Sequence, residues 1–343
     1  MRLSESLRRG ILKSSVGALI NKFKVKSRRT VLFFEEILAN YIKACEDASY
    51  AENFEKIGER WCILGTKELT PPPIKKLPLS LFFKIMKMVW TTIGILDDLS
   101  FKRDGNIIIL KAKGNTITRT IGRSNFMIGC FAGVLKAMLS CNIKCIRAVQ
   151  DKNAGEEYVF EIGAPKQFCA GSKEKETYDM LNGSKGLDGL SLAEAIRKKI
   201  FQVKGNRIFF RGTSLCNSEN TLFHILGEEN IMPEAIPELS YKYFSKLIES
   251  DASAPKKLTL LKNLLQIMGW GRIAIIQRGK NIIINAHNPP YGLQAEKDNW
   301  NFIGGTILGY LWLIRRDFKM VSVKERPRHL MITYKYGNYD SRK

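Results

Sequence analysis

The sequence has few histidines and no apolar run long enough to span a membrane. Only three of its 343 residues are histidine, and His224, His287 and His329 are widely separated in the chain. None belongs to an HExxH motif or to a Ser/His/Asp arrangement. No uncharged apolar run reaches the roughly 18 to 20 residues of a transmembrane helix. These absences argue against histidine-based catalytic sites and against a membrane-spanning helix.

Cysteine is also poorly placed for metal binding. The 7 cysteines are spread along the chain without close pairs, which fits reduced thiols better than a disulfide framework. Cys130, Cys141 and Cys145 fall near one helix–strand junction. However, zinc sites usually contain C-x2-C pairs or added histidines, and neither accompanies these residues. We therefore predict buried thiols, no metal site and no cofactor.

Carboxylates do not form a recognisable catalytic set. They occur as adjacent pairs such as Asp97-Asp98, and side chains of sequence neighbours point apart. With no catalytic constellation, we predict that the protein is not an enzyme. The first residues lack the pattern of a signal peptide, since Arg8, Arg9 and Lys13 interrupt the apolar positions. The sequence therefore predicts a cytoplasmic protein that can lie peripherally at a membrane surface.

What the chain has in excess is positive charge. Lys and Arg number 55 against 33 Asp and Glu, a formal net charge of +22. Such an excess attracts polyanions, which include nucleic acid, an anionic lipid surface and an acidic protein. The charge does not choose among these partners. A surface that is basic throughout, without any binding role, is the alternative.

Residues 1–30 form the most basic segment. Up to Val31 the chain has nine Lys or Arg and a single acid, Glu5. Apolar residues from Leu12 to Phe23 fall at helical spacing, which predicts a basic amphipathic helix. Such a helix lies on a membrane or docks on a partner. The alternative is an ordinary first helix of the following domain.

Two stretches that begin 176 positions apart share the pattern N-F-x-x-G-x-x-x-G-x-L. They run from Asn125 to Leu135 and from Asn301 to Leu311. The leading Asn suits a helix N-cap. The glycines lie four apart, hence on one helix face, although each costs about 1 kcal/mol in a helix. We expect this face to lie against the sheet of the same domain, and assign a packing role to Gly129, Gly133, Gly305 and Gly309.

Similar strands precede the two helices. Asn106–Ile109 lies 19 residues before the first helix, and Asn281–Ile284 lies 20 before the second. A repeat this long indicates duplicated domains rather than a solenoid. Each copy reads as helix–strand–strand–helix–strand–strand, with hairpin signals such as Asp104-Gly105. The predicted fold class is α+β: two tandem copies of a small antiparallel sheet with helices packed on one face.

The predicted organisation follows from this repeat. Pro71 to Pro73 and a Gly/Ser/Lys-rich stretch break the helical and strand patterns. Two copies of one fold in a single chain are expected to pack together as an intramolecular pseudo-dimer. The expected divisions are a basic N-terminal segment (1–30), a first domain (31–163), a linker (164–190), a second domain (191–337) and a tail (338–343).

The motif residues resemble a known superfamily. The helix FMIGCFAGVLKAML, followed by CIRAVQD and EYVFEI, is similar to the C-terminal half of TRAPP core subunits and to vinyl-4-reductase-type, hydrocarbon-binding domains. NFIGGTILGYLWLI, followed by MVSV and LMITY, is similar again. The resemblance covers about residues 31–163 and 205–337, and its specific part is shorter. Unlike many vinyl-4-reductase-type domains, this chain has no cysteine at its closing hairpins, in 148–160 or 318–337.

The resemblance implies a non-enzymatic binding module or scaffold, which binds an apolar small molecule of lipid or hydrocarbon type and a partner protein. The alternative is a polyanion-binding protein that uses its basic residues to contact RNA, DNA or an anionic membrane surface. His287 is a further candidate, since it ends a strand before the loop Asn288–Gly292. The candidate ligand-binding residues are Phe126, Met127, Cys130, Phe131, Phe302, Ile303, Thr306, Ile307 and His287.

Overall fold

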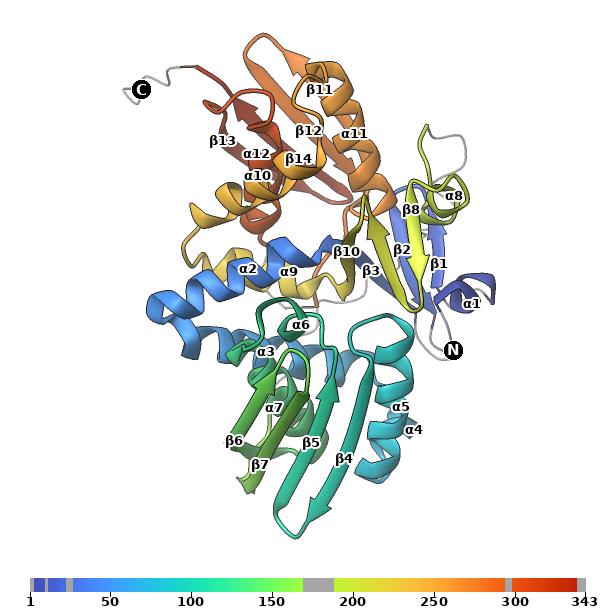
Figure 1. Cartoon of the computed structure of the whole chain (residues 1–343), viewed down its shortest axis with the longest axis vertical. Helices are drawn as coiled ribbons and strands as arrows, with labels where there is room; N and C mark the ends of the chain where they lie inside the picture. The colour runs from blue at the N-terminus through green and yellow to red at the C-terminus, as the bar shows by residue number, and fades with distance from the viewer. Residues whose placement is uncertain (1–2, 10–11, 23–26, 169–187, 294–297, 338–343) are drawn as a thin grey trace.

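Three antiparallel sheets organise the chain in the computed structural model, which describes residues 3–9, 12–22, 27–168, 188–293 and 298–337 (Figure 1). A six-stranded sheet has the order β1-β2-β3-β10-β9-β8, and two four-stranded sheets have the orders β4-β5-β7-β6 and β11-β12-β14-β13. The strands are β1 (Leu12–Ser15), β2 (Ala18–Lys22), β3 (Ser27–Phe34), β4 (Asp98–Asp104), β5 (Ile107–Lys113), β6 (Cys141–Asp151), β7 (Gly155–Pro165), β8 (Phe201–Lys204), β9 (Arg207–Phe210), β10 (Thr213–Glu219), β11 (Arg272–Arg278), β12 (Asn281–His287), β13 (Lys319–Arg326) and β14 (His329–Lys335).

Helices cover the sheets. In order they are α1 (Leu3–Arg8), α2 (Glu35–Cys45), a π-helical turn (Glu46–Tyr50), α3 (Ala51–Leu69), α4 (Pro72–Lys75), α5 (Leu79–Thr92), α6 (Thr118–Ile121), α7 (Asn125–Leu139), α8 (Leu192–Arg197), α9 (Thr221–Glu229), α10 (Ala235–Leu247), α11 (Ala254–Ile267) and α12 (Asn301–Leu311). Most of the predicted linker and the whole tail lie outside the described residues.

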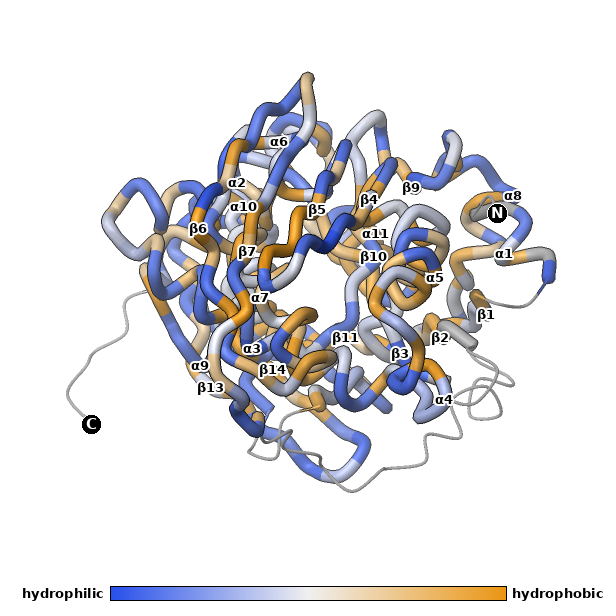
Figure 2. Tube along the Cα trace, turned by 90° about the horizontal axis from the view of Figure 1, so that it is seen from below, coloured by the Kyte–Doolittle hydropathy of each residue, from blue (hydrophilic) through white to orange (hydrophobic). Residues whose placement is uncertain are grey.

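The two halves repeat one order of elements, and this confirms the predicted α+β class with two tandem copies. A three-stranded meander comes first, then helices, a hairpin, a glycine-containing helix and a closing hairpin. Both edge strands that close the sheets carry a bulge, at Cys145/Arg147 and at Met320/Ser322. In Figure 2 apolar segments gather along the strands and helices, whereas the outer turns are polar.

The strand alignment expected from the two Asn-Ile-Ile-Ile runs is wrong by one residue. Ile108 pairs with Phe160 on the inner face of the first sheet, and Ile282 pairs with Tyr334 on that of the second. Ile108 therefore corresponds to Ile282, whereas the sequence alignment matched Ile107 to it. A slip of one residue exchanges the two faces of a strand, so only the paired register identifies the inner face.

The glycine stripes face helices instead of sheets, which corrects the expected packing partner. A Cβ at Gly129 or Gly133 would overlap the backbone of α3 at Glu55 or Glu59, and one at Gly309 would overlap α10 at Pro237. Each of these two helices therefore packs on both sides: its glycine face contacts another helix, and its opposite face contacts the sheet. On that opposite side Phe131 contacts Tyr158 of β7.

Asn125 and Asn301 are the first residues of their helices and do not cap them. Helix α7 is capped by another helix segment, since the Glu46 carboxylate accepts hydrogen bonds from Phe126 N and Ser124 Oγ. The Asn299 side chain accepts from Asn301 N in α12. By contrast, Ser191 and Glu194 form a capping box at the start of α8.

The predicted N-terminal amphipathic helix is wrong. Leu12–Ser15 and Ala18–Lys22 form the antiparallel strands β1 and β2, and helix α2 begins only at Glu35, after β3. Phe23 lies outside the described residues. Further along the chain, α5 continues to Thr92 and β4 starts at Asp98. Strong pairing partners on β3 and β10 override the local periodicity.

Each meander packs on the other half of the chain. The β1–β2 turn at Gly17 meets Gly271 of the second half, where Gly271 N donates to the Gly17 carbonyl oxygen at 3.0 Å. In the same way, the β8–β9 turn at Asn206 lies against Gly94 of the first half. All of these glycines have positive φ. A side chain at Gly17 or Gly94 would overlap the backbone that it faces, so both turns require glycine.

We predict that Gly129→Ala destabilises the protein by about 3 kcal/mol, because the new methyl group overlaps a helix backbone that cannot move aside. The matched control is Gly65→Ala on α3, where an added Cβ meets nothing within 4 Å. There the higher helix propensity of alanine should stabilise by about 0.5–1 kcal/mol. Urea unfolding measures both; equal effects of the two substitutions would contradict the close helix crossing.

Candidate functional site

In the first copy, the predicted ligand-binding residues are buried among the protein's own side chains. Phe126, Met127, Cys130 and Phe131 are all buried. The Phe126 ring stacks on Trp61 with centroids 5.9 Å apart, and Phe131 contacts Tyr158 at 4.9 Å. These residues do lie together along one helix. Their role in binding an apolar molecule stays a prediction.

The second copy repeats this arrangement. Phe302, Ile303, Thr306 and Ile307 are buried, and the Phe302 ring lies 5.6 Å from Phe33 of the first half. The Thr306 hydroxyl donates to the Phe302 carbonyl oxygen at 3.0 Å, which satisfies the only polar side chain among the four. Binding of an apolar ligand here likewise stays a prediction.

The cysteines do not gather into a metal centre. Within the described ranges, no three His, Cys, Asp or Glu side chains lie close enough together to hold a metal ion. Cys130 is buried beside Cys62 of α3, and burial raises the pKa of the Cys130 thiol well above its ordinary value. Cys141 and Cys145 are half-buried on β6.

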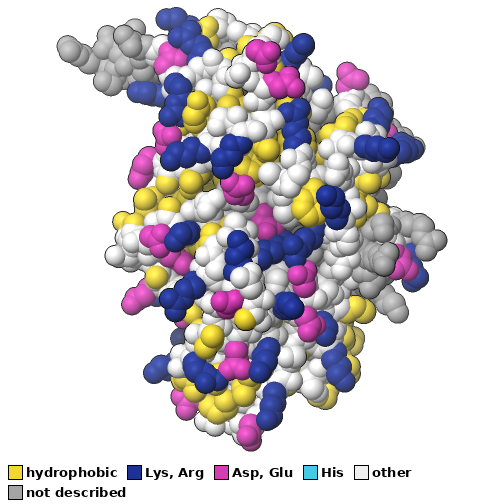
Figure 3. Space-filling model, viewed as in Figure 1, with side chains coloured by type: hydrophobic (Ala, Val, Ile, Leu, Met, Phe, Trp, Pro, Cys, Tyr) yellow, Lys and Arg dark blue, Asp and Glu magenta, His cyan; other side chains and the backbone are white. Residues whose placement is uncertain are grey.

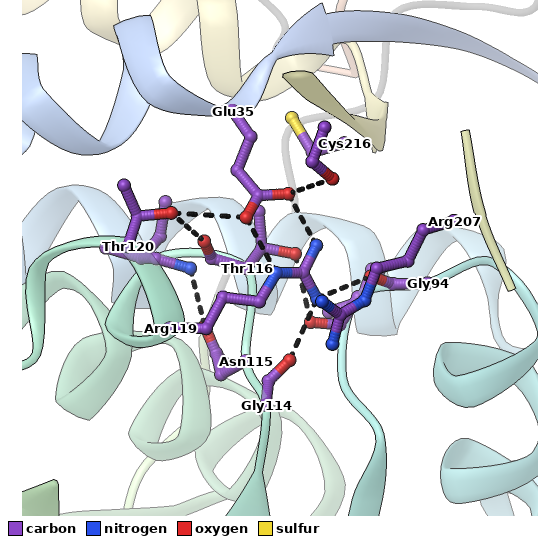
Figure 4. A network of polar contacts seen from close by, with 12 residues as sticks. Glu35, Gly94, Gly114, Asn115, Thr116, Arg119, Thr120, Arg207 and Cys216 are labelled. Carbon is purple, nitrogen blue, oxygen red and sulfur yellow. Dashed lines mark hydrogen bonds and ion pairs between the residues drawn. The ribbon is translucent and has the colours of Figure 1, made fainter. Parts of the chain in front are cut away.

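A buried ion pair joins the first half to the central sheet (Figure 4). Arg119 of α6 donates through Nε to Glu35 Oε1 at 2.6 Å, at the start of α2. The same guanidinium donates to the carbonyl oxygens of Gly94 and Gly114 at 3.1 and 2.8 Å. Ser214 of β10 completes the set by donating to Glu35 Oε2 at 2.9 Å. The network therefore fixes the position of α6 relative to β10.

A related pair occupies the other end of the central strands. Arg28 of β3 donates through Nε to Glu219 Oε1 at 3.0 Å, and its Nη2 donates to the Tyr291 carbonyl oxygen at 2.9 Å. Arg28 and the neighbouring Arg29, which is 1% exposed, belong to the segment expected to form a basic surface. That expectation is wrong for these two arginines, because both are committed to contacts inside the fold.

A buried carboxylate distinguishes the first copy from the second. Glu156 of β7 accepts hydrogen bonds from the hydroxyls of Thr118 and Tyr158. It pairs with Ala112, whereas the corresponding Ala286 pairs with Leu330 in the second sheet. Burial raises the pKa of Glu156 above its ordinary value of 4.5, and the two hydroxyl donors oppose that shift. Glu156 holds α6, which carries Arg119, against the sheet.

On the outer face of β11–β14 every charged residue is basic, and the half-buried Ile276, Ile283 and Met331 lie between them. Pairing registers place four residues in a row across the sheet: Arg272, His287, His329 and Arg326. Further rows along the strands add the remaining basic residues, and no Asp or Glu occurs among the described residues of this face. Its six lysines and arginines are Arg272, Arg278, Lys319, Lys324, Arg326 and Lys335.

The same face of the first sheet is electrically balanced. It carries five basic and five acidic residues in the equivalent rows, and Lys111 and Arg147 pair with Glu157. Figure 3 shows basic and acidic side chains interspersed over the lower part of the molecule, where Figure 1 places β4–β7. The ten residues are Lys102, Lys111, Lys113, Lys144, Arg147, Asp98, Asp104, Asp151, Glu157 and Glu161.

Of the predicted site residues, the structure places only His287 on this basic face. It is exposed, and its ring centroid lies 4.7 Å from that of His329. The sequence analysis missed the other residues of the face, although a signal existed: Arg272 and Arg278 are six residues apart, and Lys324 and Arg326 are two apart. Even spacings place both members of each pair on one face of a strand.

Comparison with models of protein families, with curated proteins and with solved structures gave no significant match. The resemblance to TRAPP and vinyl-4-reductase-type domains therefore stays a prediction. In the part of the chain that the structure describes, each helix is too short or too polar to cross a bilayer.

We predict that Arg119→Met costs about 3–5 kcal/mol, because it leaves the Glu35 carboxylate buried without its cation. The control, Arg147→Met, removes a partner from the exposed pair with Glu157 and should leave stability nearly unchanged. Urea unfolding of both variants tests the difference. A loss no larger in Arg119→Met than in the control would show that the pair does not hold α6 in place.

Glu156 makes stability depend on pH. A raised pKa in the folded state means that its contribution is fully present below about pH 4.5 and is lost as pH rises through the folded value. Glu156→Gln removes this ionisation, so the free energy of unfolding of the variant, relative to that of wild type, should increase as pH rises above about 4.5. Unfolding at pH 4–7 measures it, with the exposed Glu161→Gln on the same strand as control; parallel curves for wild type and Glu156→Gln would contradict the assignment.

Proposed function

We propose that the protein is a non-enzymatic, cytoplasmic scaffold whose second half binds nucleic acid through the outer face of β11–β14. One observation carries this proposal. Two sheets of the same topology and register differ in that face, which has six lysines and arginines and no carboxylate in the second copy. The first copy has as many acids as bases there.

The first copy shows whether the basic face of the second could result from the lysine-rich composition of the chain alone. A chain that was basic only because lysine is abundant would have both faces basic, yet the first is neutral. Protection of a sheet edge explains lysines on an edge strand such as β13. It does not explain Lys335 or the two histidines, which lie on the central strands β12 and β14. The fold itself therefore does not require the charge.

The chemistry of the face favours nucleic acid over a membrane. Membrane-surface binding combines positive charge with a buried apolar face. Here the one large apolar side chain exposed on these strands is Val321, at the β13 bulge. Between the basic residues lie groups that hydrogen-bond, including Asn281, Asn285 and Thr333. Amide and hydroxyl side chains contact phosphate and sugar oxygens in many nucleic-acid complexes.

Two basic side chains of β13 lie on the same face and can contact one phosphate backbone together. Lys324 and Arg326 lie two residues apart on one face of β13, so their Cα atoms are about 6.6–6.8 Å apart. None of the ion pairs in the described part of the chain involves Arg278, Lys324 or Arg326. Their charges are therefore available to replace condensed counterions, which is the main source of sequence-independent affinity.

We predict that the triple variant Arg278→Gln, Lys324→Gln, Arg326→Gln binds a fluorescent 30-nucleotide strand at least about tenfold more weakly at low salt. Removing three phosphate contacts should also reduce the slope of log K against log salt by about 2 to 3. Fluorescence anisotropy over a series of salt concentrations measures both quantities.

The matched control removes three charges from the balanced sheet: Lys102→Gln, Lys113→Gln, Lys144→Gln. It should bind nearly as wild type. An equal loss in both triple variants would mean that net charge alone drives binding. Absence of binding by wild type, or binding confined to anionic vesicles, would overturn the nucleic-acid proposal.

A further inference from the structure

The row across the second sheet contains two histidines in direct contact. His287 of β12 and His329 of β14 are opposite each other in the register, and their rings meet edge to face with centroids 4.7 Å apart. Arg272 pairs with His287 on one side, and Arg326 pairs with His329 on the other. The row thus holds two permanent cations and two groups that can become cations.

In the described ranges, the charged residues that share this face with the histidines are basic. Besides Arg272 and Arg326, Lys324 lies on the same face two residues before Arg326. Beneath the end of β12, the buried Arg29 donates to the Asn288 carbonyl oxygen. The turn that packs here from the first half, Gly17 with its neighbours, carries no titratable side chain. No carboxylate of the described residues bonds to either imidazole.

This environment opposes protonation when the face is empty. Partial burial, together with the neighbouring His329 and Arg272, lowers the pKa of His287 below its ordinary value of 6.5. Two like charges directly opposite each other on neighbouring strands are unfavourable. A phosphate placed over the row reverses the balance, because an anion within about 4–6 Å favours the charged form of a histidine.

We propose that this row is a phosphate-binding site, and that His287 and His329 take up protons when it is occupied. The inference rests on the proposed function, since it specifies how the same face recognises its ligand. The ligand chemistry is the phosphate group. Arg272 and Arg326 supply constant attraction, and the histidine pair adds attraction that depends on pH.

The direction of the pH dependence follows from the coupling between proton uptake and phosphate binding. His287 holds its proton more tightly in the complex than in the free protein, so its contribution is greatest below the pKa of the free imidazole. It is lost as pH rises through the pKa of the complex. Each proton taken up makes the affinity change by up to tenfold per pH unit. Between pH 7.5 and pH 5.5 we therefore expect binding to tighten by at least about tenfold.

The test measures affinity for the fluorescent 30-nucleotide strand from pH 5.5 to pH 8 at constant ionic strength. Wild type is compared with the double variant that carries both His287→Gln and His329→Gln. The single variant Lys324→Gln is the control. The double histidine variant should lose the pH dependence and keep the salt dependence. Lys324→Gln should bind more weakly at every pH and keep the slope. Melting curves establish that the variants are folded.

A second measurement uses wild type alone. Imidazole resonances followed by NMR should titrate at higher pH when the strand, or inorganic phosphate at high concentration, is present. Salt-dependent binding without pH dependence, or unshifted imidazole titrations, would overturn this inference and leave the proposed function standing. No binding to the strand would overturn both, unless vesicles of phosphatidylserine bind with the same pH dependence, which would support the row with lipid phosphate as its ligand.

Discussion

The fold depends on the exchange of meanders across the β3–β10 pair. Each half places its three-stranded meander against the other half, and the two central strands join the meanders into one sheet. The buried Arg29 guanidinium shows how tightly this joint is made, because it donates to carbonyl oxygens of Gly17, Gly269 and Asn288. A buried charge is tolerated only when such bonds replace its hydration. The ends of both halves are therefore fixed relative to each other.

Outside this contact between the meanders and the opposite halves, the sequences of the two copies can differ. Where they touch, both need glycine and the same turn geometry, as at Gly94 and Gly269–Gly271. Away from it, the first copy carries the buried Glu156 where the second carries Leu330. The outer faces have diverged further, to balanced charge in one copy and basic charge in the other. A duplicated chain of this kind separates the residues that the fold requires from those that it merely permits.

The sequence was informative where a local pattern had one physical meaning. Glycines four apart within an apolar run predicted a closely packed helix, and two-residue turns predicted the hairpins. The sequence was uninformative where the structure depends on which element packs against a segment. The glycine stripe predicts that another backbone comes close, but it does not indicate whether that backbone belongs to a helix or to a sheet. The periodicity from Leu12 to Ile20 suited a helix as well as two short strands, and only pairing with β3 selects the strands. The off-by-one alignment of Ile107 has the same origin, since an Ile-Ile-Ile run does not mark which face is inner. The basic outer face could be recognised only after the register was known.

The row Arg272–His287–His329–Arg326 is a local conflict within an otherwise consistent design. On the equivalent row of the first sheet, Asp98 pairs with Lys113, so opposite charges face each other. The second sheet has the same topology but places two histidines between two arginines, so protonation of either histidine puts like charges on neighbouring strands and weakens their pairing. Because the first copy shows that the fold can avoid this conflict, its presence in the second points to a requirement outside folding. An anion over the row removes the repulsion, and a ligand that brings many phosphates removes it along the whole face.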